Sequence, residues 1–444
     1  MNGMRLARPG RLVRICAAVL AIVGAAPGMA SAAPRAWVEM APAGGSVVRV
    51  VTDAAACPVL RVDGRDRPMA ERAAPAVLPI RSNKAHVTSP ASFATRVCEL
   101  RLARSVRRAI FGAKRLPLPS AHIDRIVVIG DTGCRLKDAD RAWQGCKDPA
   151  QWPFAAIAAR AAALHPDMVL HVGDYLYREN PCPQQEAACA QTPWGYGEAG
   201  WSADFLDPAA PLLAAAPWIM VRGNHEDCAR AGQGWWRLLD PHPLAAHRDC
   251  VDPADDAAGN HAEPYRVALG GGAQLVIADQ MTLAGAGHGD ALAAATQRAD
   301  NATIARLARG ARTTFLAAHY PVNPVLWAAG GTSAVTVGAP PVSDHAPVPL
   351  PVRAMFAGHI HLFQFARFAS LPTQVITGFS GTLEDPVLAP ASLGDVAGKP
   401  GAAAIAALTT ITGRFGHALL TRRGNGWRLT VFGLDGAVIG RFRL

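Results

Sequence analysis

Five short polar motifs, each after a run of apolar residues, constrain this 444-residue chain more than any other feature of its sequence. Short apolar runs of this kind are typical of buried strands. They occupy 126–129, 168–172, 218–221, 315–318 and 354–357. An Ala-rich stretch at 153–164 begins with a proline, as helices often do, and 290–308 also has helical character. Strands that alternate with helices predict an α/β fold.

The motifs themselves carry Asp, Asn, His and Tyr, which supply oxygen and nitrogen ligands to hard or borderline metals. Ligands of α/β proteins gather at the carboxyl ends of strands, so side chains of all five motifs are expected at one edge of a sheet. The motifs are Gly130-Asp131-Thr132-Gly133, Gly173-Asp174-Tyr175-Leu176-Tyr177, Gly223-Asn224-His225-Glu226, His319-Tyr320-Pro321 and Gly358-His359-Ile360-His361.

Seven candidate ligands are too many for one tetrahedral metal site and suit two metals that share a carboxylate. His359 and His361 lie two residues apart, so both rings leave the same face of an extended backbone. Any single motif could also be structural, as a helix cap or a hydrogen-bonded histidine, but five in succession favour a metal centre. Paired metals commonly serve in-line displacement at phosphorus. The candidates are Asp131, Asp174, Tyr177, Asn224, His319, His359 and His361.

Taken in this order, the sequences GDTG, GDYLY, GNHE, HYP and GHIH resemble the calcineurin-like metallophosphoesterases over residues 126 to about 385. Two details are similar to the purple acid phosphatases within that superfamily. The first motif reads Asp131-x-Gly133, and the second extends from Asp174 to Tyr177. The resemblance implies two packed β-sheets flanked by helices, preceded in some members by a small N-terminal β-sandwich.

The same resemblance implies how the ligands divide between two metals. The first metal would take Asp131, Asp174, Tyr177 and His361, and the second would take Asp174, Asn224, His319 and His359. Asp174 would bridge. His225 would act as the catalytic residue, contacting the phosphate together with Asn224 and reaching the leaving oxygen. Glu226 and Asp227 either orient these groups or are charges at a helix N-terminus.

The resemblance also implies a ferric ion held by the Tyr177 phenolate beside a divalent iron, zinc or manganese ion. A ferric–divalent pair carries five positive charges, and two carboxylates with one phenolate carry three negative charges. Two divalent ions with the carboxylates alone leave the same net charge, so an all-divalent pair stays open. A trivalent ion lowers the pKa of bound water further, which predicts activity in acid.

One departure concerns a second active-site histidine, which many purple acid phosphatases carry about ten residues after the histidine of the fourth motif. Residues 326–329 here read Leu-Trp-Ala-Ala. Either His345 replaces the missing histidine, or His225 alone protonates the leaving group.

The N-terminus has the three parts of a secretory signal peptide: Arg5, Arg8, Arg11 and Arg14, an apolar stretch at 15–26, and Ala30-Ser31-Ala32. The apolar stretch is shorter than the ~20 residues of a membrane span. We therefore predict a signal peptide at 1–32, a periplasmic or secreted protein, and no integral membrane segment after cleavage. Cleavage would lower the formal net charge from +10 to +6.

Cys16 would leave with the signal peptide, and an even number of cysteines in an exported chain indicates disulfides. Eight cysteines allow 105 pairings, and the sequence cannot choose among them. Sequential pairing is our working hypothesis, which gives Cys57–Cys98, Cys134–Cys146, Cys182–Cys189 and Cys228–Cys250.

Residues 33–120 read as a separate β-rich, sandwich-like domain, and residues 121–444 as the catalytic domain. Leu116-Pro117-Leu118-Pro119 would be a stiff linker between them. The stretch 101–115 holds six basic residues and no acidic one. It is either a solvated face or a grip on an anionic surface. Phe111 is its only aromatic residue, so no nucleic-acid partner is expected.

The sequence thus predicts an exported phosphatase that hydrolyses phosphomonoesters through in-line attack by a metal-bound hydroxide. A phosphodiesterase or nucleotidase on the same fold is the alternative. A non-catalytic phosphate-binding module is a third hypothesis, which the complete set of seven ligands disfavours. The substrate would be a small phosphate ester, and the sequence makes no prediction of oligomeric state.

Overall fold

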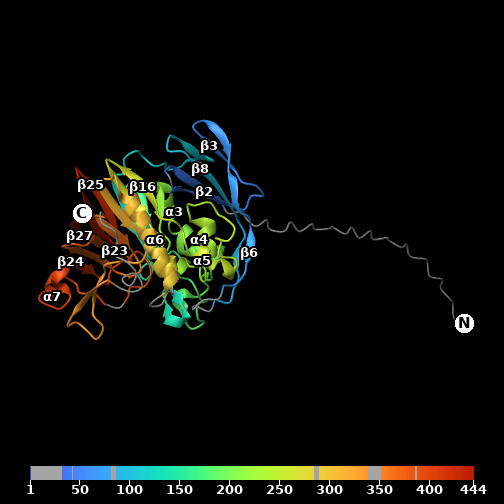
Figure 1. Ribbon diagram of the computed structural model, residues 1–444. Coiled ribbons are helices and arrows are strands. Elements are labelled where there is room, and N and C mark those ends of the chain that lie inside the picture. Colours follow the sequence, from blue (N-terminus) through green and yellow to red (C-terminus); the bar gives the residue numbers. More distant parts are fainter. Residues whose placement is uncertain (2–32, 43, 82–86, 285–289, 339–351, 386–387) are drawn as a thin grey trace. The chain divides into compact units, whose positions relative to one another are not determined.

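The computed structural model describes Met1 and residues 33–42, 44–81, 87–284, 290–338, 352–385 and 388–444. Residues from Pro34 to Leu444 form one compact unit (Figure 1). The signal peptide predicted at 1–32 and the loop that holds His345 lie outside the described residues, so both stay predictions.

Ten strands of this unit form one mixed sheet, in the order β27-β26-β25-β11-β14-β15-β1-β2-β8-β5. Its centre is parallel, with β11 beside β14 and β14 beside β15. The strands are β27 (Val438–Arg443), β26 (Gly426–Gly433), β25 (Gly416–Arg423), β11 (Arg125–Ile129), β14 (Met168–His171), β15 (Trp218–Met220), β1 (Arg35–Met40), β2 (Ser46–Thr52), β8 (Arg96–Leu102) and β5 (Ala70–Ala73).

A second sheet of seven strands has the order β16-β17-β18-β21-β23-β22-β24. Its central strands β17, β18, β21 and β23 are parallel. Strands β16 and β22 run against their central neighbours, and the edge strand β24 runs against β22. The strands are β16 (Tyr265–Gly270), β17 (Ala273–Ile277), β18 (Thr313–Ala317), β21 (Ala354–Ala357), β23 (Thr373–Thr377), β22 (Phe363–Phe368) and β24 (Ile405–Ile411).

The two sheets face each other across one apolar core, in which Val128 and Leu170 of the first sheet pack with Phe315 and Phe356 of the second. Helices cover the outer faces. Phe154 of α1 (Phe154–Ala163) belongs to the cluster on the far side of the ten-stranded sheet. The outer face of the seven-stranded sheet packs against α6 (Ala291–Ala308), which Asp290 caps through its side chain. The expected fold of two packed sheets flanked by helices is therefore confirmed.

The N-terminal strands are sandwich-like, as expected. A four-stranded sheet of β10 (Lys114–Arg115), β9 (Ala109–Phe111), β3 (Val59–Val62) and β4 (Arg65–Pro68) shares a core with β1, β2 and β8. The structure shows no boundary in packing near residue 120, because residues from Pro34 to Leu444 form one compact unit. β1 pairs in parallel with β15 at Glu39 and Trp218, which makes the N-terminal strands a continuation of the ten-stranded sheet.

The remaining elements are short. Three pairs of strands form hairpin-like sheets: β12 (Leu136–Lys137) with β13 (Ala142–Trp143), β19 (Val325–Trp327) with β20 (Val335–Val337), and β6 (Ala76–Leu78) with β7 (Ala91–Phe93). The other α-helices are α2 (Glu198–Trp201), α3 (Ala210–Ala215), α4 (Gly232–Leu238), α5 (Asp256–Gly259) and α7 (Leu393–Val396).

Four disulfides join the cysteines in the sequential pairing expected: Cys57–Cys98, Cys134–Cys146, Cys182–Cys189 and Cys228–Cys250. Such bridges are typical of proteins that fold outside the reducing cytosol. Within the part of the chain that the structure describes, none of the helices combines the length and apolar character needed to cross a bilayer.

Candidate metal centre

The five motifs meet at the carboxyl ends of strands from both sheets. Asp131 follows β11, Asp174 follows β14, Asn224 lies beyond β15, His319 follows β18, and His359 follows β21. All five lie against the same edge because β11, β14 and β15 are parallel, as are β18 and β21. The structure therefore brings the side chains of the five motifs together at the carboxyl ends of these strands.

One half of the site is built around the phenol of Tyr177. Its Oη lies 2.8 Å from Asp174 Oδ2, 3.2 Å from Asp131 Oδ1 and 3.0 Å from His361 Nε2. The two carboxylates and His361 form a group whose ligand atoms all lie within 4.8 Å of one another. These four side chains are the set that the resemblance assigned to the first metal.

The other half is built around the side-chain amide of Asn224. Its Oδ1 lies 2.9 Å from His319 Nε2 and 2.9 Å from His359 Nδ1. His319 Nε2 is also 3.3 Å from Asp174 Oδ2. Asp174, His319 and His359 form the second group of mutually close ligand atoms, so Asp174 is the residue that both groups share.

The backbone of three candidate ligands is in the left-handed region: φ is 55° at Asp131, 61° at Asp174 and 70° at His359. Non-glycine residues adopt this conformation rarely, and such strain clusters at functional sites. Glycines provide the room. A Cβ at Gly223 would lie 2.1 Å from Asp174 Oδ1, and one at Gly358 would lie 2.3 Å from Asp131 Oδ2.

Two histidines are oriented by backbone carbonyls behind them. His319 Nδ1 lies 2.9 Å from the Val172 oxygen, and His361 Nδ1 lies 2.8 Å from the Leu383 oxygen. Both rings therefore donate from Nδ1 and present Nε2 to the centre, the arrangement typical of metal-ligating histidines. Asp385 adds a carboxylate 3.2 Å from His361 Nδ1, a partner that no sequence pattern had indicated.

The electrostatics of the site fit cations. Burial raises the pKa of Asp131 to about 7 against the influence of His319 and His361. Burial acts the same way on Asp174, but His319 and His225 hold its pKa well below the usual range. Among the described residues, histidines alone form ion pairs with these two carboxylates. Two buried carboxylates beside imidazole, amide and phenol donors, with no arginine or lysine to pair them, are a fitting donor set for a metal pair.

Glu226 holds the loop that carries Asp174. Its carboxylate accepts hydrogen bonds from the backbone N–H groups of Asp174, Tyr175 and Gly223 at 2.9–3.1 Å. Of the two roles expected for Glu226, the structure thus favours the orienting one. Burial, followed by the neighbouring Asp174 charge, raises the pKa of Glu226 to about 8.

His225 does not join either ligand group. Its Nε2 faces Asp174 Oδ2 at 4.0 Å, while its Nδ1 lies 2.8 Å from Glu179 Oε1. Arg230 pairs with the same Glu179 oxygen. Burial, followed by the Arg230 charge, lowers the pKa of His225 to about 4. Glu179 and Arg230 were missed by the sequence interpretation, although Glu179 stands only two residues after Tyr177.

The region of the missing histidine is a short hairpin. Residues Val325–Trp327 pair with Val335–Val337, and the ring of Trp327 lies under the Lys399 ammonium at 4.9 Å. The structure therefore places an aromatic side chain and a lysine here. The alternative donor, His345, lies outside the described residues.

The comparisons with known proteins agree with this geometry. A family model described as calcineurin-like phosphoesterase matches residues 124–363, more than half of the chain. The chain belongs to this family, and it is a phosphoesterase hydrolase whose fold implies two metal ions. No curated protein sequence matches it.

Three solved structures match the chain at low identity, and the first of them shows the same fold. A purple acid phosphatase, PPD1, from yellow lupin (Lupinus luteus) seeds is 13% identical, with a TM-score of 0.58, and the match covers 93% of this chain and 74% of the lupin chain. A structure titled PhoD is 10% identical, with a TM-score of 0.49, over 93% of this chain and 91% of that chain. GAP50 of Plasmodium is 12% identical, with a TM-score of 0.43, over 72% and 88%.

Proposed function

We propose that this protein is an exported phosphatase of the purple acid phosphatase type, which hydrolyses phosphomonoesters at a ferric–divalent metal pair. One observation carries the proposal: seven side chains from five motifs meet in two ligand groups that share Asp174. The lupin phosphatase fold supports it. The signal peptide predicted at 1–32 and the four disulfides support export to the periplasm or the medium.

Asp131, Asp174, Tyr177 and His361 would hold the first metal, and Asp174, Asn224, His319 and His359 the second. When bound, such a pair would activate a water molecule and offset the charge of the phosphoryl oxygens. Tyr177 favours a ferric ion at the first position. Burial and the two aspartates raise the pKa of its phenol well above the usual value, so the phenolate needs a strong cation beside it.

The chain itself positions the ester. Asn224 lies between His319 and His359, and His225 lies beside Asp174; both would contact the phosphate. Glu179 accepts from Nδ1 of His225, so the second proton that this ring takes up near its pKa of about 4 would be on Nε2, where it could reach the leaving oxygen. Because no protein side chain has to be phosphorylated in this arrangement, direct displacement in line is the expected route.

The test compares metal content with activity. The wild type should contain two metals per chain and hydrolyse p-nitrophenyl phosphate faster than bis(p-nitrophenyl) phosphate. Asp174→Ala should lose both metals and all activity. Asp167→Ala is the matched control, because this aspartate lies before the start of β14 and accepts backbone hydrogen bonds from Asp124 and Arg125.

Three results would contradict the proposal. Retention of two metals by Asp174→Ala would remove the shared ligand. A preference for the diester would favour the phosphodiesterase alternative, which uses the same site. If the protein with both metals bound hydrolysed neither substrate, the hypothesis of a non-catalytic phosphate-binding module would be favoured.

A further inference from the structure

A recess lined by three arginines lies at the amino ends of β17 and β18, whereas the metal centre lies at the carboxyl ends of the parallel strands. Its wall includes the start of β17 at Ala273 and residues 310–311, which precede β18. His319 instead follows the end of β18. A strand of five residues spans roughly 16 Å. The recess is therefore separate from the site proposed to hydrolyse phosphate esters, and its empty volume is about 1010 Å³.

The three arginines come from different parts of the chain. Arg104 belongs to the loop between β8 and β9, Arg266 to β16, and Arg309 follows α6. We call this site the arginine recess. No acidic residue lines it, and none of the three guanidinium groups has an ion-pair partner among the described residues. Three like charges around one hollow repel one another, and an anion placed between them removes that repulsion.

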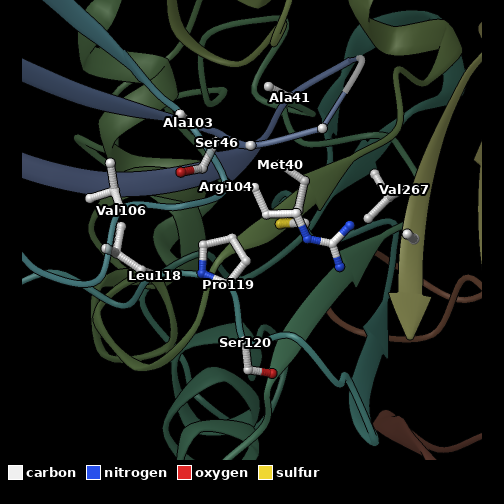
Figure 2. A pocket seen from close by; sticks show the side chains of 13 residues that line it. Met40, Ala41, Ser46, Ala103, Arg104, Val106, Leu118, Pro119, Ser120 and Val267 are labelled. Carbon is white, nitrogen blue, oxygen red and sulfur yellow. The ribbon is translucent and has the colours of Figure 1, made fainter. Parts of the chain in front are cut away.

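An apolar pocket adjoins the arginine recess and shares Arg104 with it (Figure 2). The Arg104 guanidinium lies toward the Val267 side of this pocket, and Val106, Leu118 and Pro119 lie on the other side (Figure 2). A ligand that fills both hollows needs an anionic head and an apolar part.

The positive charge of the chain is concentrated in the part that supplies Arg104. Residues 33–120 contain 15 Lys and Arg against 6 Asp and Glu, whereas residues 121–444 contain 25 against 28. The positive charge of the protein after residue 32 therefore resides in its N-terminal strands, which supply Arg104. An anionic surface would attract this part of the protein first.

From these observations we propose that the arginine recess and its apolar pocket bind an acidic phospholipid at a membrane surface. The headgroup phosphate would lie among Arg104, Arg266 and Arg309, and part of an acyl chain would enter the pocket beside Val106 and Leu118. Because the metal centre is at the other edge of the sheet, a docked protein would keep that centre open to soluble esters.

The experiment measures partitioning of the full chain onto vesicles of phosphatidylglycerol and of phosphatidylcholine by sedimentation. We expect binding to phosphatidylglycerol that weakens with salt. The wild type and every variant share residues 1–32, so the differences between them exclude any contribution of the predicted signal peptide. A triple variant, Arg104→Glu, Arg266→Glu and Arg309→Glu, should lower the partition coefficient on the order of a hundredfold. Val106→Asn, which makes the pocket polar, should lower it about tenfold.

The matched control is Arg428→Glu, Arg441→Glu and Arg443→Glu, which changes the net charge equally at exposed positions of β26 and β27. It should bind within about threefold of wild type. Thermal unfolding by circular dichroism verifies the fold of every variant independently of phosphatase activity, so failure of the proposed function leaves this test intact.

Several outcomes would overturn the proposal. Equal binding to both lipids would show that the headgroup charge is not recognised. Equal loss of binding in both triple variants would show that the net charge of the protein, and not the arginine recess, determines binding. Inorganic phosphate that binds as tightly as vesicles, with no effect of Val106→Asn, would identify a free anion as the ligand. Tighter binding of a single-stranded oligonucleotide with the same arginine dependence would identify nucleic acid.

Discussion

Glu179→Gln is the most informative single change at the metal centre, because it removes one charge and preserves the shape of the side chain. Glu179 is fully buried and accepts from Arg230 while its Oε1 lies 2.8 Å from His225 Nδ1. It belongs to neither ligand group. The substitution therefore separates the positioning of His225 from the binding of metals.

The magnitude follows from the pKa of Glu179. Burial alone would raise it, but Arg230 and His225 lower it from 4.5 to about 2. That fall corresponds to about 3 kcal/mol in favour of the ionised form, which glutamine cannot supply. We expect the free energy of unfolding near pH 7 to drop by about 3 kcal/mol, in line with other buried pairs that lose one partner.

The assay compares two substrates and the metal content. If the protonated ring of His225, which Glu179 stabilises, donates to the leaving oxygen, kcat for phenyl phosphate at pH 4 should fall roughly a hundredfold, since general acid catalysis is worth about that much. The loss for p-nitrophenyl phosphate should be smaller, because its leaving group needs less protonation. KM and the two metals per chain should stay near wild-type values, and Glu179→Asp should recover part of kcat.

Glu186→Gln, at an exposed position in the following loop, is the control and should change neither kcat nor stability. The reasoning is refuted if Glu179→Gln keeps wild-type kcat on phenyl phosphate with both metals bound. Equal losses on the two substrates would also refute it, because the effect would then not involve the leaving group.

Three further predictions concern other parts of the structure. Gly223→Ala should weaken metal binding at least tenfold, because its Cβ would lie 2.1 Å from Asp174 Oδ1, whereas Gly394→Ala, with its nearest atom at 3.5 Å, should not; elemental analysis of both variants decides. Tyr177→Phe should abolish a phenolate-to-iron absorption band in the visible spectrum, and a colourless wild type with two zinc ions would show an all-divalent site instead. Burial and Arg160 lower the pKa of His417 to about 4. The unfolded protein therefore binds more protons than the folded protein between pH 6.5 and 4, and the free energy of unfolding decreases as the pH is lowered through this range. His417→Asn should reduce this acid loss by about 3 kcal/mol at pH 4, and identical pH profiles of unfolding would contradict the argument.

Much of the fold could be predicted because apolar runs report burial directly. Residues 126–129 became part of β11, and 354–357 matches β21. Helix α6 begins after Asp290, where a side-chain cap was available in the sequence. The seven candidate ligands could be predicted for the same reason: strand ends in parallel sheets lie at one edge, so a motif after each strand is brought to the same place.

The chain order alone could not give the pairing of β1 with β15, because sheet neighbours far apart in sequence depend on which edge remains open after the core has formed. It also could not give the partners of His225 and His361. Glu179, Arg230 and Asp385 lie in segments whose local pattern resembles any polar loop, and their contacts exist only after the loops have packed together.

The sequence by itself therefore determined the strands that precede the motifs, the order of the motifs and the kinds of atoms offered to metals, since these depend on neighbours along the chain. Only the tertiary structure decided that Asp174 is shared by two ligand groups, which glycines make room for them, and that three distant arginines surround one recess. These depend on distances between residues far apart in the chain, which are fixed when the two sheets and their helices pack.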